Sequence, residues 1–306
     1  MNISVIIPTY NGADKIEKIL QSLEKQTFQN FEIIVGIDGS TDNTKEILEK
    51  QSYLLRERLI IFEQENKGRA VIRNNAAKKA KSNLLVFFDD DMIPNENSIE
   101  KHYSHHLINK ISILGGNQLD KYEGKVIDFL KFKEYLSKKW MSIYGNKVSL
   151  LRKDNLFVTA ANFSISKTLF FNLGGFDERL TDAEDWDLSV RALEQGIDIY
   201  FDPENIAYHN DYVTCKKYIL RQRQYLQAHK TLETLKPQLY SNKYKRNIII
   251  KFSLFKNILF IVFANKFNVC LIDNFNIYKI LPKYIRYKIY DIIVTGLGKI
   301  YINKNI

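Results

Sequence analysis

The chain has few cysteines, few prolines and little glycine. Its 306 residues include 2 Cys, 5 Pro and 13 Gly. Cys215 and Cys270 are too few for a disulfide framework and lack the spacing of a zinc site, so we expect a reducing compartment. The scarcity of Gly and Pro excludes a fibrous repeat. Because 45% of the residues are apolar and 26% are charged, a disordered tail is excluded and a globular protein is expected.

Long hydrophobic runs are also missing. Residues 1–8 lack the basic start and the long apolar core of a signal peptide, so a cytosolic chain is expected. Near the end, Lys251 and Lys256 interrupt the apolar clusters at 248–250 and 258–264. Neither cluster reaches the ~20 apolar residues that a membrane-spanning helix needs.

Positive charge is concentrated in the last third of the chain. The net charge is +10, but residues 1–215 carry 27 Lys and Arg against 32 Asp and Glu, whereas residues 216–306 carry 18 against 3. No recognisable nucleic-acid-binding module accompanies these basic residues, which disfavours a nucleic-acid-binding tail. Since Ile, Phe and Tyr lie among the lysines, we expect a basic, aromatic-rich helical extension that lies on an anionic membrane surface. An ordinary helical subdomain is the alternative.

Strands and helices alternate through the first two thirds. Four apolar runs are typical of strands: 3–8, 31–37, 59–62 and 84–88. Three intervening segments have helical spacing: 13–26, 41–50 and 69–81. The pattern weakens over 115–158, where 129–144 fits a helix or a loop over the site. Further elements follow: a strand and a helix within 160–176, a helix at 185–195 and a strand at 197–201. This alternation predicts an α/β fold with a parallel, doubly wound sheet.

Polar residues follow three of these strands, at the sheet edge where ligands bind in such folds. They are 8–11, 38–40 and the triplet Asp89, Asp90 and Asp91. The three adjacent carboxylates would repel one another, and a divalent cation would remove that repulsion. Mg²⁺ and Mn²⁺ are commonly held by such oxygen ligands together with phosphate. A solvated acidic turn is the alternative.

A second acidic cluster opens the helix at 185–195. Asp182, Glu184, Asp185 and Asp187 surround Trp186. Acids in a first turn often only complement the helix dipole, but four of them exceed that need. A carboxylate at a helix N-terminus stays ionised and suits a base that accepts a proton from a hydroxyl, while Trp186 provides an apolar wall.

Basic side chains complete the candidate set. His209 near a strand end is a plausible further metal ligand. Arg69 and Arg73 lie four residues apart on one helix and can face the same way, which suggests an anionic substrate such as a diphosphate. The stretch containing His102, His105 and His106 is polar, so we expect these histidines on the surface.

Four motifs in order resemble the family 2 glycosyltransferases, the inverting nucleotide-sugar enzymes of GT-A fold. They are VIIPTYNG at 5–12, the segment 33–44 ending in DGSTDNT, FDDD at 88–91, and GGFDE at 174–178 followed by EDWD at 184–187. The match spans residues 3–210. The resemblance implies a GT-A catalytic domain over 1–215, with a Rossmann-like, mostly parallel sheet, followed by the basic extension over 216–306.

The resemblance also implies roles for the matching residues. On the donor side, Pro8, Tyr10 and Asp38 would line the nucleoside pocket, Arg73 would lie near the nucleotide and Asp90 near the ribose. Asp91 and Asp89 would hold Mn²⁺ or Mg²⁺, with His209 as the late histidine ligand. On the acceptor side, Asp185 would be the catalytic base, supported by Glu184 and Asp187, with Asn162 and Trp186 near the acceptor.

The implied reaction is a single displacement. A sugar would move from a nucleotide-diphosphate sugar, expected to be a UDP-sugar, to a hydroxyl of a glycan or lipid-linked oligosaccharide in surface polysaccharide synthesis at the inner face of the cell membrane. Ile37 stands where the family usually has a further acid, which bears on nucleotide choice. An inactive nucleotide-sugar-binding protein is the alternative, and the acids at 184, 185 and 187 argue against it because binding alone needs no second carboxylate cluster.

Overall fold

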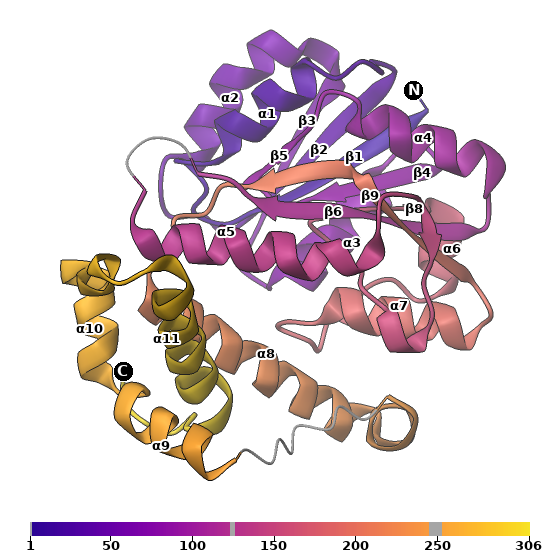
Figure 1. The fold of residues 1–306 in the computed structure, drawn as a ribbon. Helices are drawn as coiled ribbons and strands as arrows, with labels where there is room; N and C mark the ends of the chain where they lie inside the picture. The colour runs from indigo at the N-terminus through magenta and orange to yellow at the C-terminus, as the bar shows by residue number, and fades with distance from the viewer. Residues whose placement is uncertain (1, 123–125, 245–252) are drawn as a thin grey trace. The chain divides into compact units, whose positions relative to one another are not determined.

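A computed structural model describes residues 2–122, 126–244 and 253–306, so the apolar cluster at 248–250 and Lys251 lie outside the described residues. The chain divides into two compact units (Figure 1). The first comprises residues 1–121 and 138–210, and the second comprises 122–137 and 211–306. Each unit is described on its own below.

The first unit is built on a nine-stranded, mostly parallel sheet with the strand order β3-β2-β1-β4-β8-β6-β9-β5, and β7 pairs with β9. The strands are β1 (Ile3–Thr9), β2 (Phe31–Asp38), β3 (Leu59–Gln64), β4 (Leu84–Phe88), β5 (Met92–Pro94), β6 (Ser112–Asp120), β7 (Ser149–Leu150), β8 (Asn162–Ser166) and β9 (Asp198–His209). The first four run parallel to one another. β8 is antiparallel to both β4 and β6, whereas β6 is parallel to β9. The doubly wound α/β prediction is therefore confirmed.

Helices cover both faces of this sheet (Figure 1). They are α1 (Ile16–Glu24), α2 (Thr44–Leu55), α3 (Arg69–Lys79), α4 (Ser98–Ile108), α6 (Lys167–Asn172) and α7 (Glu184–Glu194). β1, β2 and β4 are buried along their whole length, which explains why their sequences are continuously apolar rather than alternating. On one face α1 buries Ile16, Ile19, Leu20 and Leu23 at helical spacing. On the other, Phe87 stacks on Phe163 and contacts Phe170 and Phe176.

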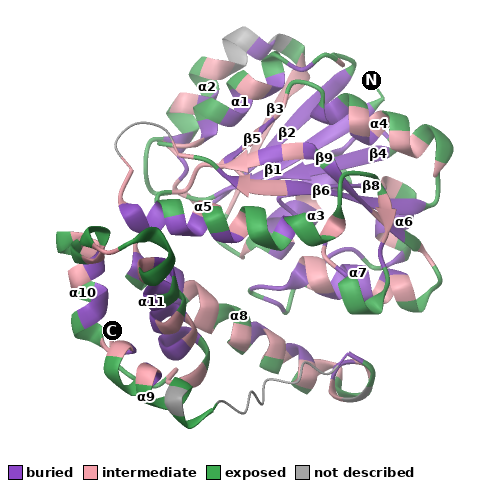
Figure 2. Cartoon of the chain, viewed as in Figure 1, coloured by how far each residue is buried: buried purple, intermediate pink, exposed green. Residues whose placement is uncertain are grey.

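The second unit is helical. It contains the first part of α5 (Asp128–Met141), followed by α8 (Cys215–Leu235), α9 (Leu254–Phe263), α10 (Lys266–Phe275) and α11 (Lys283–Thr295). Its core includes Phe129, Phe132, Tyr290, Ile293 and Leu297 (Figure 2). Asp128 is buried in this core; it accepts a hydrogen bond from Tyr290 Oη at 3.1 Å and forms an ion pair with Arg286 Nε at 2.8 Å. The segment 129–144 is therefore mainly helix rather than loop.

Six short 3₁₀ or π-helical turns complete the described elements: η1 (Arg56–Arg58), η2 (Ser142–Tyr144), η3 (Lys153–Asn155), η4 (Gln238–Lys243), η5 (Ile277–Ile280) and η6 (Gly296–Ile300). Among the residues that the structure describes, no single helix combines the length and the apolar composition of a membrane span. The helical segments Lys256–Phe263 and Lys266–Phe275, bent by 62° against each other, meet these criteria only as a pair.

Candidate active site

The carboxyl ends of β1, β2 and β4 meet at one edge of the sheet, because these strands are parallel neighbours. The loop after β1 is tied to the loop after β2 by hydrogen bonds from Asn11 N to Ser40 Oγ at 3.0 Å and from Thr41 N to Asn11 Oδ1 at 2.8 Å. Thr9 Oγ1 donates to Asp90 Oδ2 at 2.7 Å. The three polar loops therefore form one continuous rim.

Gly12 is required by this close packing. A Cβ atom at this position would lie 2.6 Å from Asp90 Oδ2 and 2.2 Å from Thr9 Oγ1. Any larger residue would displace the hydrogen bond that anchors Asp90 to β1. The glycine of the first motif thus serves the geometry of the acidic triplet.

The predicted nucleoside-side residues differ in their accessibility. Pro8 is buried within β1, whereas the Tyr10 side chain is 53% exposed. Asp38 is buried, and its carboxylate accepts hydrogen bonds from Gln64 Nε2 and from the backbone N–H groups of Lys67 and Gly68 at 2.8–2.9 Å. In this structure Asp38 therefore holds the loop before α3. Of the three residues, Tyr10 is the one whose ring is accessible for stacking against a base.

One arginine joins the two acidic clusters. Arg73 of α3 is 2% exposed and donates through Nη2 to Asp89 and through Nη1 to Glu184. Burial alone would lower the pKa of Arg73, but the charges of the two carboxylates raise it above its ordinary value, so the guanidinium stays charged. The end of β4 and the first turn of α7 are thus held against the same side chain.

The predicted position of Arg73 near the nucleotide stays a prediction. Its guanidinium is enclosed between two protein carboxylates, so in this structure it links Asp89 and Glu184. The neighbouring Arg69 has a side chain that is 41% exposed and lies 3.8 Å from Asp182. Of the two arginines, Arg69 is the one that an anionic ligand can reach.

The acids around Trp186 separate into buried and accessible members. Asp182, Glu184 and Asp187 are at most 7% exposed, whereas Asp185 and Trp186 are partly exposed. Asp187 pairs with Arg191 at 2.7 Å, and Arg191 also donates to the carbonyl groups of Leu173 and Gly175. The buried acids therefore hold the start of α7 in place, and Asp185 is the carboxylate of this cluster that a substrate can meet.

Asp185 is oriented by two backbone hydrogen bonds. Its Oδ2 accepts from Ala160 N at 2.9 Å and its Oδ1 accepts from Trp186 N at 2.7 Å. Burial raises the pKa of Asp185 despite these bonds and the charge of Arg73. Burial also raises the pKa of Glu184, to about 7. A carboxylate whose pKa is raised is a stronger proton acceptor at neutral pH.

Asp91 and His209 lie together on the other side of the triplet. The distance from His209 Nε2 to Asp91 Oδ2 is 3.3 Å. Burial would raise the pKa of Asp91, but the charge and hydrogen bond of His209 lower it to about 2. Within the described ranges, Oδ1 of Asp91 is buried without a hydrogen-bond partner. A buried, ionised and partly unsatisfied carboxylate beside an imidazole fits a divalent cation.

Asp89 does not join this pair, because its Oδ1 contacts Arg73. The expectation that Asp89 is a metal ligand is therefore not supported by its position. Asp90, which lies between Asp89 and Asp91 in the sequence, accepts the hydrogen bond from Thr9 Oγ1. Burial and the charge of Asp91 raise the pKa of Asp90 to about 7, against the opposing hydrogen bond of Thr9 and the charge of Lys15.

Two site residues have no counterpart in the sequence-based set. Asp120 ends β6 in register with His209 of β9, and its Oδ1 lies 3.4 Å from His209 Nδ1. Lys15 precedes α1 and lies close enough to Asp90 and Asp91 for its charge to lower the pKa of both carboxyl groups. An acid at the end of the run 112–120 could have indicated Asp120, but Gly115 and Gly116 interrupt the strand pattern there.

Asn162 and His102 of α4 contact each other in the interior of the first unit. Asn162 is fully buried, and its amide group donates to the carbonyl groups of Asn117 and Asn205. Its Oδ1 lies 3.0 Å from His102 Nε2, and His102 Nδ1 lies 2.8 Å from Ser164 Oγ. The predicted surface position of His102 is therefore wrong, whereas the acceptor-side role of Asn162 stays a prediction. Burial lowers the pKa of His102 to about 4, so this histidine is neutral at physiological pH.

The mostly parallel, Rossmann-like sheet with helices on both faces is that of the GT-A class of folds. The chain has a TM-score of 0.56 with the structure of residues 1–349 of S. aureus TarS, at 21% identity over 99% of this chain and 92% of that one. It has the same score with GalNAc-T7 solved with UDP, GalNAc and Mn²⁺, at 16% identity over 80% of this chain and 52% of that one. These likenesses show the fold.

The sequence places the chain within this class. The model of glycosyl transferase family 2 matches residues 4–172, more than half of the chain, and the protein belongs to this family. Glycosyltransferase AglE of Haloferax volcanii is 27% identical over 209 residues, which are 68% of this chain and 66% of AglE. The Escherichia coli β-1,3-glucosyltransferase WfgD is 35% identical over 116 residues, 38% of this chain and 45% of WfgD. The chain spans about two thirds or less of the length of these relatives.

Proposed function

We propose that this protein is an inverting glycosyltransferase that moves a sugar from a UDP-sugar to a hydroxyl of a glycan or lipid-linked oligosaccharide in surface polysaccharide synthesis. One observation carries the proposal: Arg73 holds Asp89 of the triplet and Glu184 of α7 together, and this places the accessible Asp185 beside the carboxylates that follow β4. A protein that only binds a nucleotide sugar has no need of that second, accessible carboxylate.

On the donor side, the exposed ring of Tyr10 can stack on the base, and Asp90 can accept from a ribose hydroxyl. Asp91 and His209 would hold Mn²⁺ or Mg²⁺. The charge of Lys15, which acts on Asp91, and the partly exposed Arg69 would attract the diphosphate. When bound, the cation would neutralise the charge that grows on the leaving diphosphate. An imidazole beside a carboxylate favours Mn²⁺ over Mg²⁺, which is held mainly by oxygen.

On the acceptor side, Asp185 takes the proton from an acceptor hydroxyl, and Trp186 forms an apolar wall beside it. The hydroxyl oxygen then bonds to the anomeric carbon from the face opposite the diphosphate, and the bond from that carbon to the diphosphate oxygen breaks. The configuration inverts. Glu184 and Asp187 take no part in the proton transfer, because both are buried against arginines that hold the start of α7.

The names of relatives and structural neighbours support the choice of donor and cation. WfgD is described as using UDP-Glc and a diphosphoundecaprenol-linked acceptor, TarS has been solved with UDP-GlcNAc, and GalNAc-T7 has been solved with UDP and Mn²⁺. A panel of nucleotide sugars, each with Mn²⁺, Mg²⁺ or EDTA, tests the proposal through release of nucleoside diphosphate. We expect release from one UDP-sugar that requires the cation. Donor binding without release, with acceptors present, would support the inactive nucleotide-sugar-binding protein instead.

The rate of transfer should depend on the ionisation of Asp185. Because the base acts as the carboxylate and burial raises its pKa, kcat at saturating donor and cation should fall as the pH drops through a value above the ordinary 3.8. Arg73 opposes this rise and Asp182 adds to it. A profile of kcat against pH measures this fall on its acidic side, the acid limb. A limb centred at or below pH 4 would mean that Asp185 is not the group that titrates.

Replacing Asp120 should weaken cation binding. Asp120 faces Nδ1 of His209, so it holds the ring with Nε2 toward Asp91. Loss of such an outer partner typically lowers metal affinity by about 10–100-fold. We expect Asp120→Asn to weaken Mn²⁺ binding in the presence of UDP by at least about tenfold, measured by the electron paramagnetic resonance signal of free Mn²⁺. The exposed Asp154→Asn variant is the matched control and should bind normally. Equal affinity in both variants would contradict the role of Asp120.

A further inference from the structure

The second unit presents an apolar stripe on α9. Leu254, Ile258, Ile261 and Val262 are spaced as one helical face, and they are 80, 50, 65 and 54% exposed. The opposite face is buried, with Phe260 at 1% exposure and Ala264, just after the helix, fully buried. The helix is therefore anchored in the unit by one face and leaves a second apolar face open.

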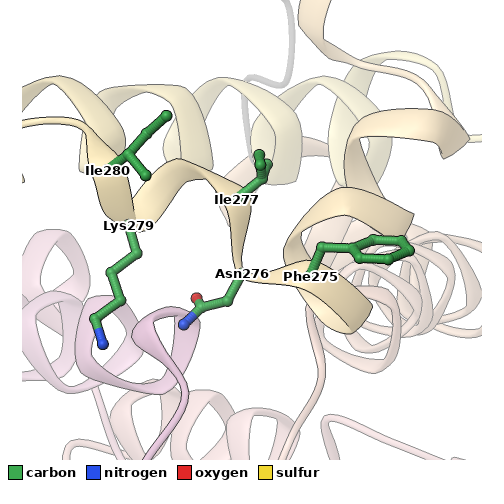
Figure 3. Close-up of a pocket in the computed structure, with 5 residues that line it drawn as sticks. All are labelled: Phe275, Asn276, Ile277, Lys279 and Ile280. Carbon is green, nitrogen blue, oxygen red and sulfur yellow. The ribbon is translucent and has the colours of Figure 1, made fainter.

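The next elements also carry exposed apolar residues. On α10, Phe267 and Phe275 are each 67% exposed. In the η5 turn that follows, Ile277 and Ile280 lie on one side, whereas Lys279 and the preceding Asn276 point to the other (Figure 3). Apolar and polar side chains are thus separated across the turn as in an amphipathic element. We call the exposed apolar residues of α9 and α10 the α9–α10 surface.

The segment that carries the α9–α10 surface is strongly basic. Residues 253–288 contain six Lys or Arg residues and a single acid, Asp273. The Asp273 carboxylate accepts hydrogen bonds from the backbone N–H groups of Cys215 and Lys216 at 2.7 and 3.0 Å, so it caps the start of α8. Five of the six cations are exposed lysines, at positions 256, 266, 279, 283 and 288.

We propose that the α9–α10 surface lies in the headgroup region of an anionic lipid bilayer. Its apolar side chains would enter the acyl boundary, and the lysines would meet the lipid phosphates. α9 and α10 have 10 residues each, about half of what a spanning helix needs, and the bend between them suits a position in the plane of the interface. A second copy of this chain is a poorer occupant, because it would bring two sets of lysines together.

The inference goes beyond the proposed reaction, because it rests on residues of the second unit alone. Flotation of the full chain with phosphatidylcholine vesicles, with and without phosphatidylglycerol, tests it. We expect the chain to float with the anionic vesicles, and less so as salt is raised. The double variant Ile258→Glu with Ile261→Glu should reduce the bound fraction by at least about tenfold, because each carboxylate removes apolar contact and repels the headgroups.

The matched control places the same two charges elsewhere. Ile108 and Ile111 of the first unit are 84 and 70% exposed, so the double variant Ile108→Glu with Ile111→Glu should float like the unaltered chain. Circular dichroism and donor turnover of both variants establish that each is folded. Flotation of the α9 variant equal to that of its control, or no flotation of the unaltered chain, would overturn the proposal. Loss in the α9 variant of a dimer that forms without lipid would assign the surface to self-association instead.

Discussion

Replacing Asp185 with Asn is expected to lower kcat by about 10²–10⁴-fold, the usual contribution of a positioned base. The amide has nearly the same shape but takes up a proton far less readily. Asp185 lies on α7, whereas the donor-side carboxylates follow β4, so the affinity for UDP with Mn²⁺ should stay close to that of the unaltered protein. Initial rates and isothermal titration with UDP measure the two quantities separately.

The matched control is Glu194→Gln, at the exposed last turn of the same helix. It removes one charge from α7 far along the helix from Asp185, and kcat should not change. Turnover of Asp185→Asn similar to that of this control would remove Asp185 from the role of base. Equal losses of turnover and of UDP binding would assign it to donor binding.

Replacing Arg73 with Met should destabilise the fold by about 3–5 kcal/mol, the typical cost of breaking a buried ion pair from one side. Arg73 is 2% exposed and donates hydrogen bonds to both Asp89 and Glu184. Without it, burial would raise the pKa of Glu184 still further, so the loss of stability should grow as the pH rises and Glu184 is forced to ionise. Urea unfolding at pH 6 and pH 8 measures the effect.

Two further variants distinguish the loss of the two Arg73 ion pairs from the loss of one positive charge. Arg69→Met removes a partly exposed arginine from the same helix and should cost about 1 kcal/mol or less. The double variant Arg73→Met with Glu184→Gln no longer carries the buried Glu184 charge, so it should be more stable than Arg73→Met alone. If Arg73→Met and Arg69→Met had equal effects, Arg73 would not hold the two clusters together.

The N-terminal half of the sheet could be predicted from the sequence because local rules suffice there. β1, β2 and β4 are buried on both faces and appear as continuous apolar runs, and α1 has an unambiguous apolar stripe. In the other half, β6 contains two adjacent glycines and β5 has three residues. The antiparallel position of β8 between β4 and β6 depends on pairing between distant segments, which no local pattern specifies.

The sequence predicts that the site contains two acidic clusters. It does not predict which residue each of these side chains pairs with. The motifs indicated the residues at 89–91 and 184–187, whereas burial decides which of them face a ligand. Arg73 is buried because two carboxylates neutralise its charge. Asn162 and His102 form a hydrogen bond with each other inside the unit, and a pattern based on apolar spacing assigns such polar residues to the surface.

Residues 122–137 belong to the second unit through aromatic contacts such as that of Phe129 with Tyr290, which involve distant parts of the chain.

The central claim is that the cation-binding carboxylate and the base belong to one site, and the fluorine NMR signal of Trp186 tests it most directly. Trp186 adjoins Asp185, and the chain has one other tryptophan, Trp140, so 5-fluorotryptophan in a Trp140→Phe background gives a single reporter. Saturating Mn²⁺ with UDP should broaden this signal strongly, whereas Mg²⁺ with UDP, or Mn²⁺ with UDP added to Asp91→Asn, should leave it sharp. A signal that is as sharp with saturating Mn²⁺ as with Mg²⁺ would place the cation far from Asp185 and contradict the account.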